Sequence, residues 1–169
     1  MGQGVLILGI DPGTAITGYG LVREDDGTLT LVDCGVITTP ASQSLPARLQ
    51  ILYQGLADVV HAHRPTAAAV EELFFSRNVR TALSVGHARG VALLALADAG
   101  LPIFEYKPLE VKQAIAGYGG ADKQQVQEMV RMLLRLNHVP QPDDAADAIA
   151  VAVCHIHSAR MMALIAEAG

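Results

Sequence analysis

Four carboxylates in apolar surroundings limit the folds that this chain can adopt. They lie in three separate segments: Asp11, Glu71, Asp144 and Asp147. Asp11 follows the apolar run 5–10, Glu71 follows the run 67–70, and the two aspartates begin an alanine-rich segment. An ionised carboxylate is rarely left in such surroundings unless it is paired or holds a metal. The chain has three lysines, and none lies near these acids in the sequence. We therefore expect the fold to bring the acids together around a cation.

The chemistry of the four acids predicts a metal-dependent nuclease. Hard divalent cations such as Mg²⁺ prefer oxygen ligands. Two such ions held about 3.5–4 Å apart can clamp the attacking and leaving oxygens of a phosphodiester. Asp144 and Asp147 are three residues apart, so they point from one face of a helix. The alternative interpretation is that these acids only stabilise the start of a helix. It explains Asp143 and Asp144 well, but Asp147 less well because its neighbours are apolar.

Length and composition favour a single globular domain over residues 1–169. Domains usually contain roughly 100–200 residues, and 51% of this chain is hydrophobic. No apolar run approaches the roughly 20 residues needed to span a bilayer, and no basic region precedes the first apolar run as in a signal peptide. Two cysteines are too few for a disulfide framework and suit a reducing compartment. We expect a cytoplasmic protein.

The charge distribution leaves nucleic-acid binding open. The formal net charge of −5 at pH 7 argues by itself against a nucleic-acid partner. However, eight of the twelve basic residues lie between Arg77 and Arg135, and four of the acids belong to the proposed metal site, where bound cations would cancel them. A basic surface around that site and a mildly acidic protein with ordinary solvated charges both fit these numbers.

The pattern of apolar residues and turn signals predicts an α/β fold, with a mixed five-stranded sheet and helices on both faces. Strands are predicted over residues 5–10, 16–23, 28–37, 67–73 and 102–106. Helices are predicted over residues 45–60, 79–99, 108–116, 123–136 and from 144 onward. Tight turns join the first three strands into an antiparallel meander, and Asp143 is the expected cap of the last helix. Small residues in the second helix, among them Gly86 and Gly90, fit either a partner subunit or burial within one chain.

Two motifs have more than one interpretation. The segment 9–14 has three interpretations. It could place a metal ligand at the end of a central strand, form the phosphate-binding hairpin of the actin and sugar-kinase class of ATPases, or be an ordinary strand-turn-strand. Glu71 and Glu72 are adjacent in a strand and point to opposite faces. Only one of them can therefore share a site with Asp11, and periodicity does not say which.

The segment after Glu71 combines aromatic, basic and polar residues that suit DNA. Aromatic rings beside basic residues can stack on unpaired bases, at about 1–3 kcal/mol per base, although a pair of core-filling rings is the ordinary alternative. Lysines can bind phosphate or stabilise transition-state charge, and solvated helix faces are their alternative. The candidate DNA contacts are Phe74, Phe75, Arg77, Asn78, Arg80, Lys107 and Lys123, with Lys112 as a candidate catalytic residue. Cys154, His155 and His157 lie on different faces of a helix and are interpreted as structural.

Taken together, these segments closely resemble the RuvC family of Holliday-junction resolvases. Each matching stretch is weak alone, but the set occurs in the family's order along nearly the whole chain. The stretches are Ile10-Asp11-Pro12-Gly13, Val70-Glu71-Glu72-Leu73-Phe74, Gly86-His87-Ala88-Arg89-Gly90, Phe104-Glu105-Tyr106, Val111-Lys112-Gln113 and Asp144-Ala145-Ala146-Asp147-Ala148. The resemblance implies the RNase H-like fold of the retroviral-integrase superfamily.

The resemblance also implies roles for particular residues. The implied metal ligands and catalytic acids are Asp11, Glu71, Asp144 and Asp147. They would hold two Mg²⁺ or Mn²⁺ ions per subunit, and Glu72 would take no part. Phe74 matches the aromatic ring that stacks on a base at the open centre of the junction. Lys112 and Lys123 match basic residues needed near the scissile phosphate.

The same resemblance implies the partners, and two alternative functions compete with it. It implies four-way junction DNA as substrate, a homodimer through the helix from Val79, and the branch-migration proteins RuvA and RuvB, in a bacterial cytoplasm. An actin-like ATPase fragment is one alternative, but that class normally needs two such domains and further nucleotide motifs that the chain lacks. A non-catalytic junction-binding module is the other alternative, and it would not need four carboxylates at metal-ligand positions.

Overall fold

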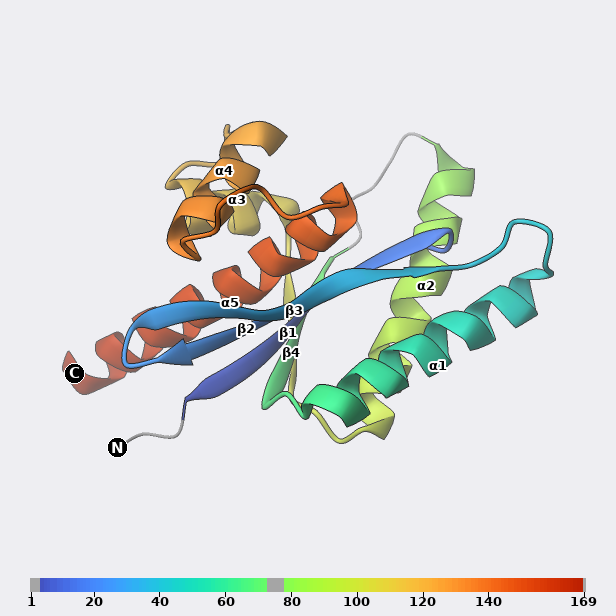
Figure 1. Cartoon of the computed structure of the whole chain (residues 1–169), viewed down its shortest axis with the longest axis horizontal. Coiled ribbons are helices and arrows are strands. Elements are labelled where there is room, and N and C mark those ends of the chain that lie inside the picture. The colour runs from blue at the N-terminus through green and yellow to red at the C-terminus, as the bar shows by residue number, and fades with distance from the viewer. Residues whose placement is uncertain (1–3, 73–77, 169) are drawn as a thin grey trace.

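A mixed five-stranded sheet forms the centre of the molecule (Figure 1). The computed structural model describes residues 4–72 and 78–168. The strands are β1 (Val5–Asp11), β2 (Ile16–Asp25), β3 (Thr28–Thr38), β4 (Ala67–Glu71) and β5 (Ile103–Tyr106). They lie in the order β3-β2-β1-β4-β5; β1 to β3 form an antiparallel meander, and β1, β4 and β5 are parallel. The predicted fold class is therefore confirmed.

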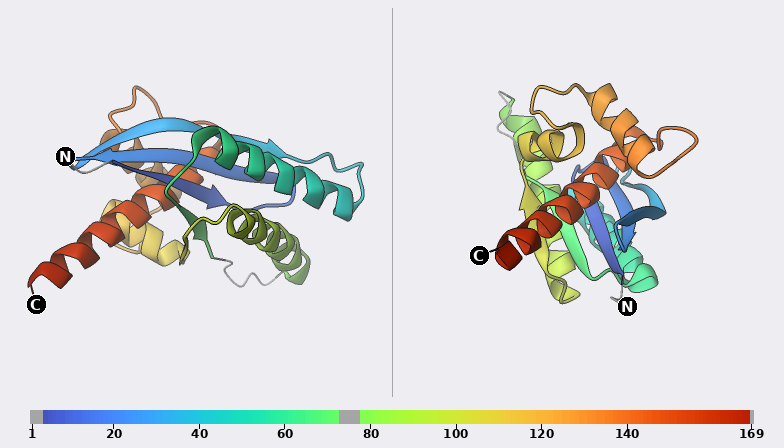
Figure 2. Two further views of the ribbon diagram at one scale, coloured as in Figure 1. Left: turned by 90° about the horizontal axis from the view of Figure 1, so that it is seen from below. Right: turned by 90° about the vertical axis from the view of Figure 1, so that its left-hand side faces the viewer.

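Helices cover both faces of the sheet (Figure 2). The helices are α1 (Leu45–His63), α2 (Val79–Asp98), α3 (Pro108–Ala116), α4 (Lys123–Leu133) and α5 (Asp143–Ala168). One face packs against α1 and α2, and the other packs against α5, which α3 and α4 cover in turn. Because strand side chains alternate between faces, Leu8 and Ile10 of β1 join the core with α1 and α2, whereas Ile7 joins the core with α5.

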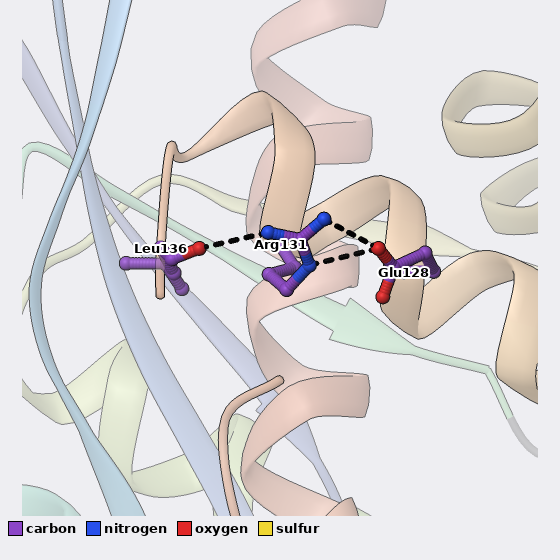
Figure 3. A network of polar contacts seen from close by, with 3 residues as sticks. All are labelled: Glu128, Arg131 and Leu136. Atoms are coloured by element: carbon purple, nitrogen blue, oxygen red, sulfur yellow. Dashed lines mark hydrogen bonds and ion pairs between the residues drawn. The ribbon is translucent and has the colours of Figure 1, made fainter. Parts of the chain in front are cut away.

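Two predicted boundaries were wrong at α4 and α5. α4 ends at Leu133 rather than near residue 136, because Arg135 has a left-handed backbone (φ 53°) that a right-handed helix does not accommodate. Arg131 holds this end of α4, since its guanidinium bonds the Glu128 carboxylate and donates to the carbonyl of Leu136 at 3.1 Å (Figure 3). Asp143 is not the cap of α5 but its first helical residue.

β4 is also shorter than predicted, and it ends at Glu71 rather than at residue 73. Beyond it, the backbone N–H of Glu72 still donates to the carbonyl of Tyr106 at 2.8 Å, so the chain stays beside β5 for one more residue. Residue 73, the predicted end of this strand, lies outside the described residues.

α5 is long and apolar enough to cross a bilayer by length and composition, contrary to the expectation that no segment approaches that limit. Half of its apolar stretch is buried within the fold. All residues over 148–156 are buried, against the sheet on one side and against α3 and α4 on the other. This burial is the pattern of a core helix. The last turns of α5 extend beyond the sheet, where Met161 and Met162 are exposed (Figure 2).

Candidate active site

Asp11 and Glu71 end two neighbouring parallel strands on the same face of the sheet. β1 and β4 pair with Ile10 opposite Val70, so the next residue of each strand is an acid. Ile10 and Val70 both join the core with α1 and α2. The alternation of side chains then places Asp11 and Glu71 on the opposite face, beneath α5. The structure thus brings Glu71 to Asp11 and leaves Glu72 beyond the end of the strand.

Glycines on β1 and β2 allow α5 to lie directly on the sheet, because they have no side chain. A Cβ on Gly18 would lie 1.9 Å from the carbonyl oxygen of Asp144, and one on Gly9 would lie 2.0 Å from that of Ala148. Such distances are far inside van der Waals contact. Gly18 is also the β2 partner of Asp11. The contact therefore brings the start of α5, with its two aspartates, to the end of β1.

The turn after Asp11 is fixed by short side-chain hydrogen bonds. The hydroxyl of Thr17 donates to the carbonyl of Gly13 at 2.7 Å, and the hydroxyl of Thr14 donates to the carbonyl of Ser84 in α2 at 2.6 Å. Thr14 and Thr17 are both buried. The end of β1 is thus tied to α2 on one side of the sheet while Asp11 faces α5 on the other.

The four acids act on one another electrostatically. Burial raises the pKa of Asp11 to about 8, with further contributions from the charges of Glu71, Asp147 and Asp144 and from a hydrogen bond with Glu71. Burial also raises the pKa of Glu71, which the hydrogen bond with Asp11 and the nearby lysines partly oppose. In this bond a protonated Asp11 donates to an ionised Glu71, which raises the pKa of Asp11 and lowers that of Glu71. Without a cation, the site holds more negative charge than its surroundings balance.

Two lysines face these acids from the helices above the sheet. A pocket of 210 Å³ lies between them, lined by Glu71, Pro108, Val111, Lys112, Lys123, Val126, Asp147 and Ala150. Lys112 is half-buried in α3, and its charge lowers the pKa of Glu71. The ammonium of Lys123 lies 3.2 Å from the carboxylate of Asp147 and 3.5 Å from that of Asp143.

The contacts of Lys123 affect its own pKa and that of Asp147. Burial opposes the charge of Lys123, but the hydrogen bond and charge of Asp147, followed by those of Asp143, raise the pKa of this lysine. Burial raises the pKa of Asp147 despite its bond to Lys123. One lysine therefore only partly compensates for the carboxylates around it.

The donor set suits a hard divalent cation. Carboxylate oxygens are the ligands that Mg²⁺ and Mn²⁺ prefer. Burial is the largest cause of the raised pKa values of Asp11, Glu71 and Asp147, and it disfavours their charged forms unless a cation compensates. Within residues 4–72 and 78–168, no three acidic, histidine or cysteine side chains form a ready-made metal cluster. The fit is thus one of donor chemistry and charge, and binding would require the carboxylates to draw closer.

Four of the seven predicted DNA contacts belong to the described residues: Asn78, Arg80, Lys107 and Lys123. Phe74, Phe75 and Arg77 fall outside the described residues. The side chain of Asn78 caps α2 by accepting from the backbone N–H groups of residues 80 and 81, a role that the sequence analysis did not foresee. Arg80 is exposed in the first turn of α2, and Lys107 is exposed just before α3.

The cysteine and histidines of α5 point into the core and its edge. Nδ1 of His155 lies 2.8 Å from the hydroxyl of Tyr106, and its ring stacks on Phe104 with centroids 4.3 Å apart. Burial lowers the pKa of His155 and raises that of Cys154 to about 11. Nδ1 of His157 lies 3.3 Å from the carbonyl of Ala114. These contacts agree with the structural interpretation of the three residues.

The chain matches one family of nucleases over most of its length. The family model described as "Crossover junction endodeoxyribonuclease RuvC" matches residues 7–155. Proteins with that description from Roseiflexus sp. (strain RS-1) and Chloroflexus aggregans are 62% identical over 160 residues and 63% identical over 152 residues. These alignments cover 95% of both chains in the first case, and 90% of this chain and 93% of the relative in the second.

Solved structures give the same result. Thermus thermophilus RuvC in complex with Holliday junction substrate superimposes with a TM-score of 0.89 at 39% identity, covering 93% of this chain and 96% of that one. The yeast mitochondrial Holliday junction resolvase Ydc2 superimposes with a TM-score of 0.66 at 12% identity, over 89% of this chain and 77% of that one. The second likeness supports the fold alone.

Proposed function

This chain belongs to the RuvC family of crossover junction endodeoxyribonucleases, and we propose that it resolves four-way (Holliday) DNA junctions in homologous recombination and DNA repair. The observation that carries the proposal is that acids from β1, β4 and α5 lie near enough to Asp11 for their charges to raise its pKa. The matched Thermus structure contains a Holliday junction substrate, which supports the same substrate here. The whole chain, residues 1–169, would act as one nuclease domain.

Asp11, Glu71, Asp144 and Asp147 are proposed to hold two Mg²⁺ ions, with Mn²⁺ as a substitute. When bound, such ions activate water for attack and stabilise the leaving 3′ oxygen of a phosphodiester. The protein's part is to hold the carboxylates of Asp11 and Glu71 against those at the start of α5. Lys112 and Lys123, at the mouth of the pocket, would orient the scissile phosphate and stabilise its transition-state charge.

Paired symmetric nicks require two active sites, so the active form is proposed to be a homodimer. One stripe of α2 is apolar and open: Val79, Leu83 and Leu94 are 70%, 58% and 55% exposed. On the same stripe, Gly86 and Gly90 have nothing within 4 Å of an added Cβ. The opposite side of α2 is buried against the sheet through Ala88 and Ala92. A second copy of α2 could approach this stripe closely because no side chains fill it at the two glycines.

The remaining contacts are proposed from the sequence and the family. Phe74 would stack on a base at the junction centre, and the further proposed DNA contacts are Phe75, Arg77, Asn78, Arg80 and Lys107. RuvA and RuvB are the proposed branch-migration partners, and the bacterial cytoplasm is the proposed location.

Cleavage of a synthetic four-way junction tests the proposed function. Purified protein with Mg²⁺ should introduce symmetric nicks across the junction and spare a linear duplex of the same sequence. The products should carry 5′-phosphate and 3′-hydroxyl ends, so ligase should reseal them. Junction binding without cleavage in either Mg²⁺ or Mn²⁺ would indicate a non-catalytic junction-binding module instead. Thermal stabilisation by ATP without any cleavage would indicate an actin-like nucleotide site.

A further inference from the structure

Two neighbouring helices present matched pairs of side chains beside the proposed metal site. Lys123 and Gln127 are four residues apart on α4, and Asp143 and Asp147 are four residues apart on α5, so each pair shares one helix face. Lys123 bridges both aspartates, at 3.2 Å from Asp147 and 3.5 Å from Asp143. The amide of Gln127 donates to the other oxygen of Asp143 at 3.3 Å. Each oxygen of the Asp143 carboxylate is thus in contact with a side chain of α4.

Asp143 differs from the four acids assigned to the metal. It is 55% exposed, whereas Asp147 is 28% exposed. It precedes Asp144 by one residue, so it points in another direction around α5. Within the described part of the chain, its side chain contacts Lys123 and Gln127 of α4, whereas the carboxylates that act on Asp11 are Glu71, Asp147 and Asp144. Asp143 is therefore placed to act on Lys123 rather than on a metal ion.

We propose that Asp143 is a positioning residue, which keeps Lys123 at the active site when a metal ion takes Asp147 as a ligand. This inference rests on the proposed function. A divalent cation bound by Asp147 competes with the ammonium of Lys123 for the same carboxylate and repels it. A lysine side chain is long and flexible and carries much rotamer freedom. With Asp143 as its second partner, Lys123 exchanges Asp147 for a phosphate oxygen of the substrate without leaving the rim of the pocket.

Both ends of the Asp143 anchor are fixed by the fold. The segment between α4 and α5 is held by Arg131, which joins Glu128 to the carbonyl of Leu136 (Figure 3). Asp122 caps α4 by accepting from the backbone N–H of Gln125 at 2.8 Å, immediately before Lys123. The cap holds the start of α4, and the close approach of the Asp144 carbonyl oxygen to Gly18 holds the start of α5 when the bond to Asp147 is exchanged.

A double-mutant cycle tests the anchor. Single-turnover cleavage of a synthetic junction is measured at saturating Mg²⁺ for wild type, Asp143→Asn, Lys123→Met and the double variant. Asp143→Asn should slow cleavage about fivefold, the effect of losing one partly exposed ion pair. In the Lys123→Met background the same substitution should have no further effect. Asp143→Glu should restore most of the rate. Asp26→Asn, the same exchange at an exposed residue in the turn between β2 and β3, is the control and should leave the rate unchanged. Equal slowing by Asp143→Asn in both backgrounds would overturn the proposal.

A second readout follows Lys123 without cleavage. The chain has three lysines, so the ε-ammonium resonance of Lys123 can be assigned with one substitution in lysine-labelled protein. On titration with Mg²⁺, this group should stay restricted in wild type and become as mobile as a free lysine in Asp143→Asn. A Lys123 that is equally mobile in both Mg²⁺-saturated proteins, or equally restricted in both, would overturn the proposal. Failure of wild type to cleave junctions would instead contradict the proposed function.

Discussion

Gly18 and Asp144 are in direct backbone contact, since a Cβ on Gly18 would lie 1.9 Å from the carbonyl oxygen of Asp144. Gly18 also pairs with Asp11 across β1 and β2. Gly18, which has no side chain, therefore sets the distance between Asp11 and Asp144, two of the proposed metal ligands. The site depends on how closely α5 can approach the sheet as much as on the acids themselves.

Gly18→Ala should displace the start of α5 and disable the site. Overpacking of this kind typically costs about 1–3 kcal/mol, so the free energy of unfolding should fall by that amount in urea titrations. Cleavage should fall further than stability suggests, because Asp144 and Asp147 move away from Asp11. Gly120→Ala is the control, since its Cβ would meet nothing nearer than 3.5 Å. Wild-type cleavage by the Gly18→Ala protein would contradict this account of the site.

Amide substitution of any one of the four acids should reduce junction cleavage by at least about 100-fold while leaving junction binding largely intact. Each change removes a ligand charge and keeps the side-chain shape. The variants are Asp11→Asn, Glu71→Gln, Asp144→Asn and Asp147→Asn, assayed for single-turnover cleavage and for affinity in Ca²⁺.

Glu72→Gln is the matched control for these variants, because Glu72 lies beyond β4 and is adjacent to a proposed ligand. Its cleavage rate should stay close to wild type. An inactive Glu72 variant beside an active Glu71 variant would show that the assignment of the β4 ligand is reversed.

Asp11→Asn should stabilise the metal-free protein at alkaline pH. The pKa of Asp11 is raised from 3.8 to about 8 in the fold, so between these values the folded state binds more protons than the unfolded state. The stability of wild type should therefore fall as pH rises from about 4 to 8. The neutral amide removes this dependence, and at pH 8.5 the variant should be more stable by at least about 1 kcal/mol. Urea unfolding in EDTA at several pH values measures the difference, and parallel pH profiles for the two proteins would contradict it.

The sequence predicted the layers of this fold better than its closest contacts. Both faces of β1 and β4 are buried, so the apolar pattern of these strands does not reveal which of Glu71 and Glu72 shares a face with Asp11. The structure resolves that choice because Val70 joins the core with α1 and α2. A glycine in a strand indicates a close approach, but the sequence does not say that the partner of Gly18 is Asp144, more than a hundred residues away.

Local rules also misplaced Asp143. An acid before a helix is a common cap, and that rule does not foresee that Lys123 and Gln127 from another helix take this carboxylate. The roles of the four acids and of Phe74 stay predictions, and Phe74 lies outside the described residues.

Lys112→Ala should slow cleavage without changing the salt dependence of junction binding. Lys112 is half-buried, lines the pocket beside Glu71 and lowers the pKa of that acid, so we expect it to act on transition-state charge. A lysine that binds a phosphate in the ground state contributes close to one unit to the slope of log affinity against log salt. Single-turnover rates and salt titrations of the same variant separate the two roles. A variant with wild-type rate and wild-type slope would assign Lys112 to the solvated surface.

Leu83→Glu should convert the proposed dimer to a monomer and change its products. Leu83 is 58% exposed on the open stripe of α2, and a buried unpaired charge between two such helices is strongly unfavourable. Sedimentation should show a monomer. Thermal unfolding should show that this monomer is still folded. Met162→Glu is the control, on an apolar residue of α5 that is 68% exposed, and it should remain dimeric. On a plasmid with an extruded cruciform, paired cuts by a dimer give linear DNA, whereas a monomer should give nicked circles. A Leu83→Glu protein that sediments as a dimer and yields linear DNA would show that the subunits do not meet at this stripe.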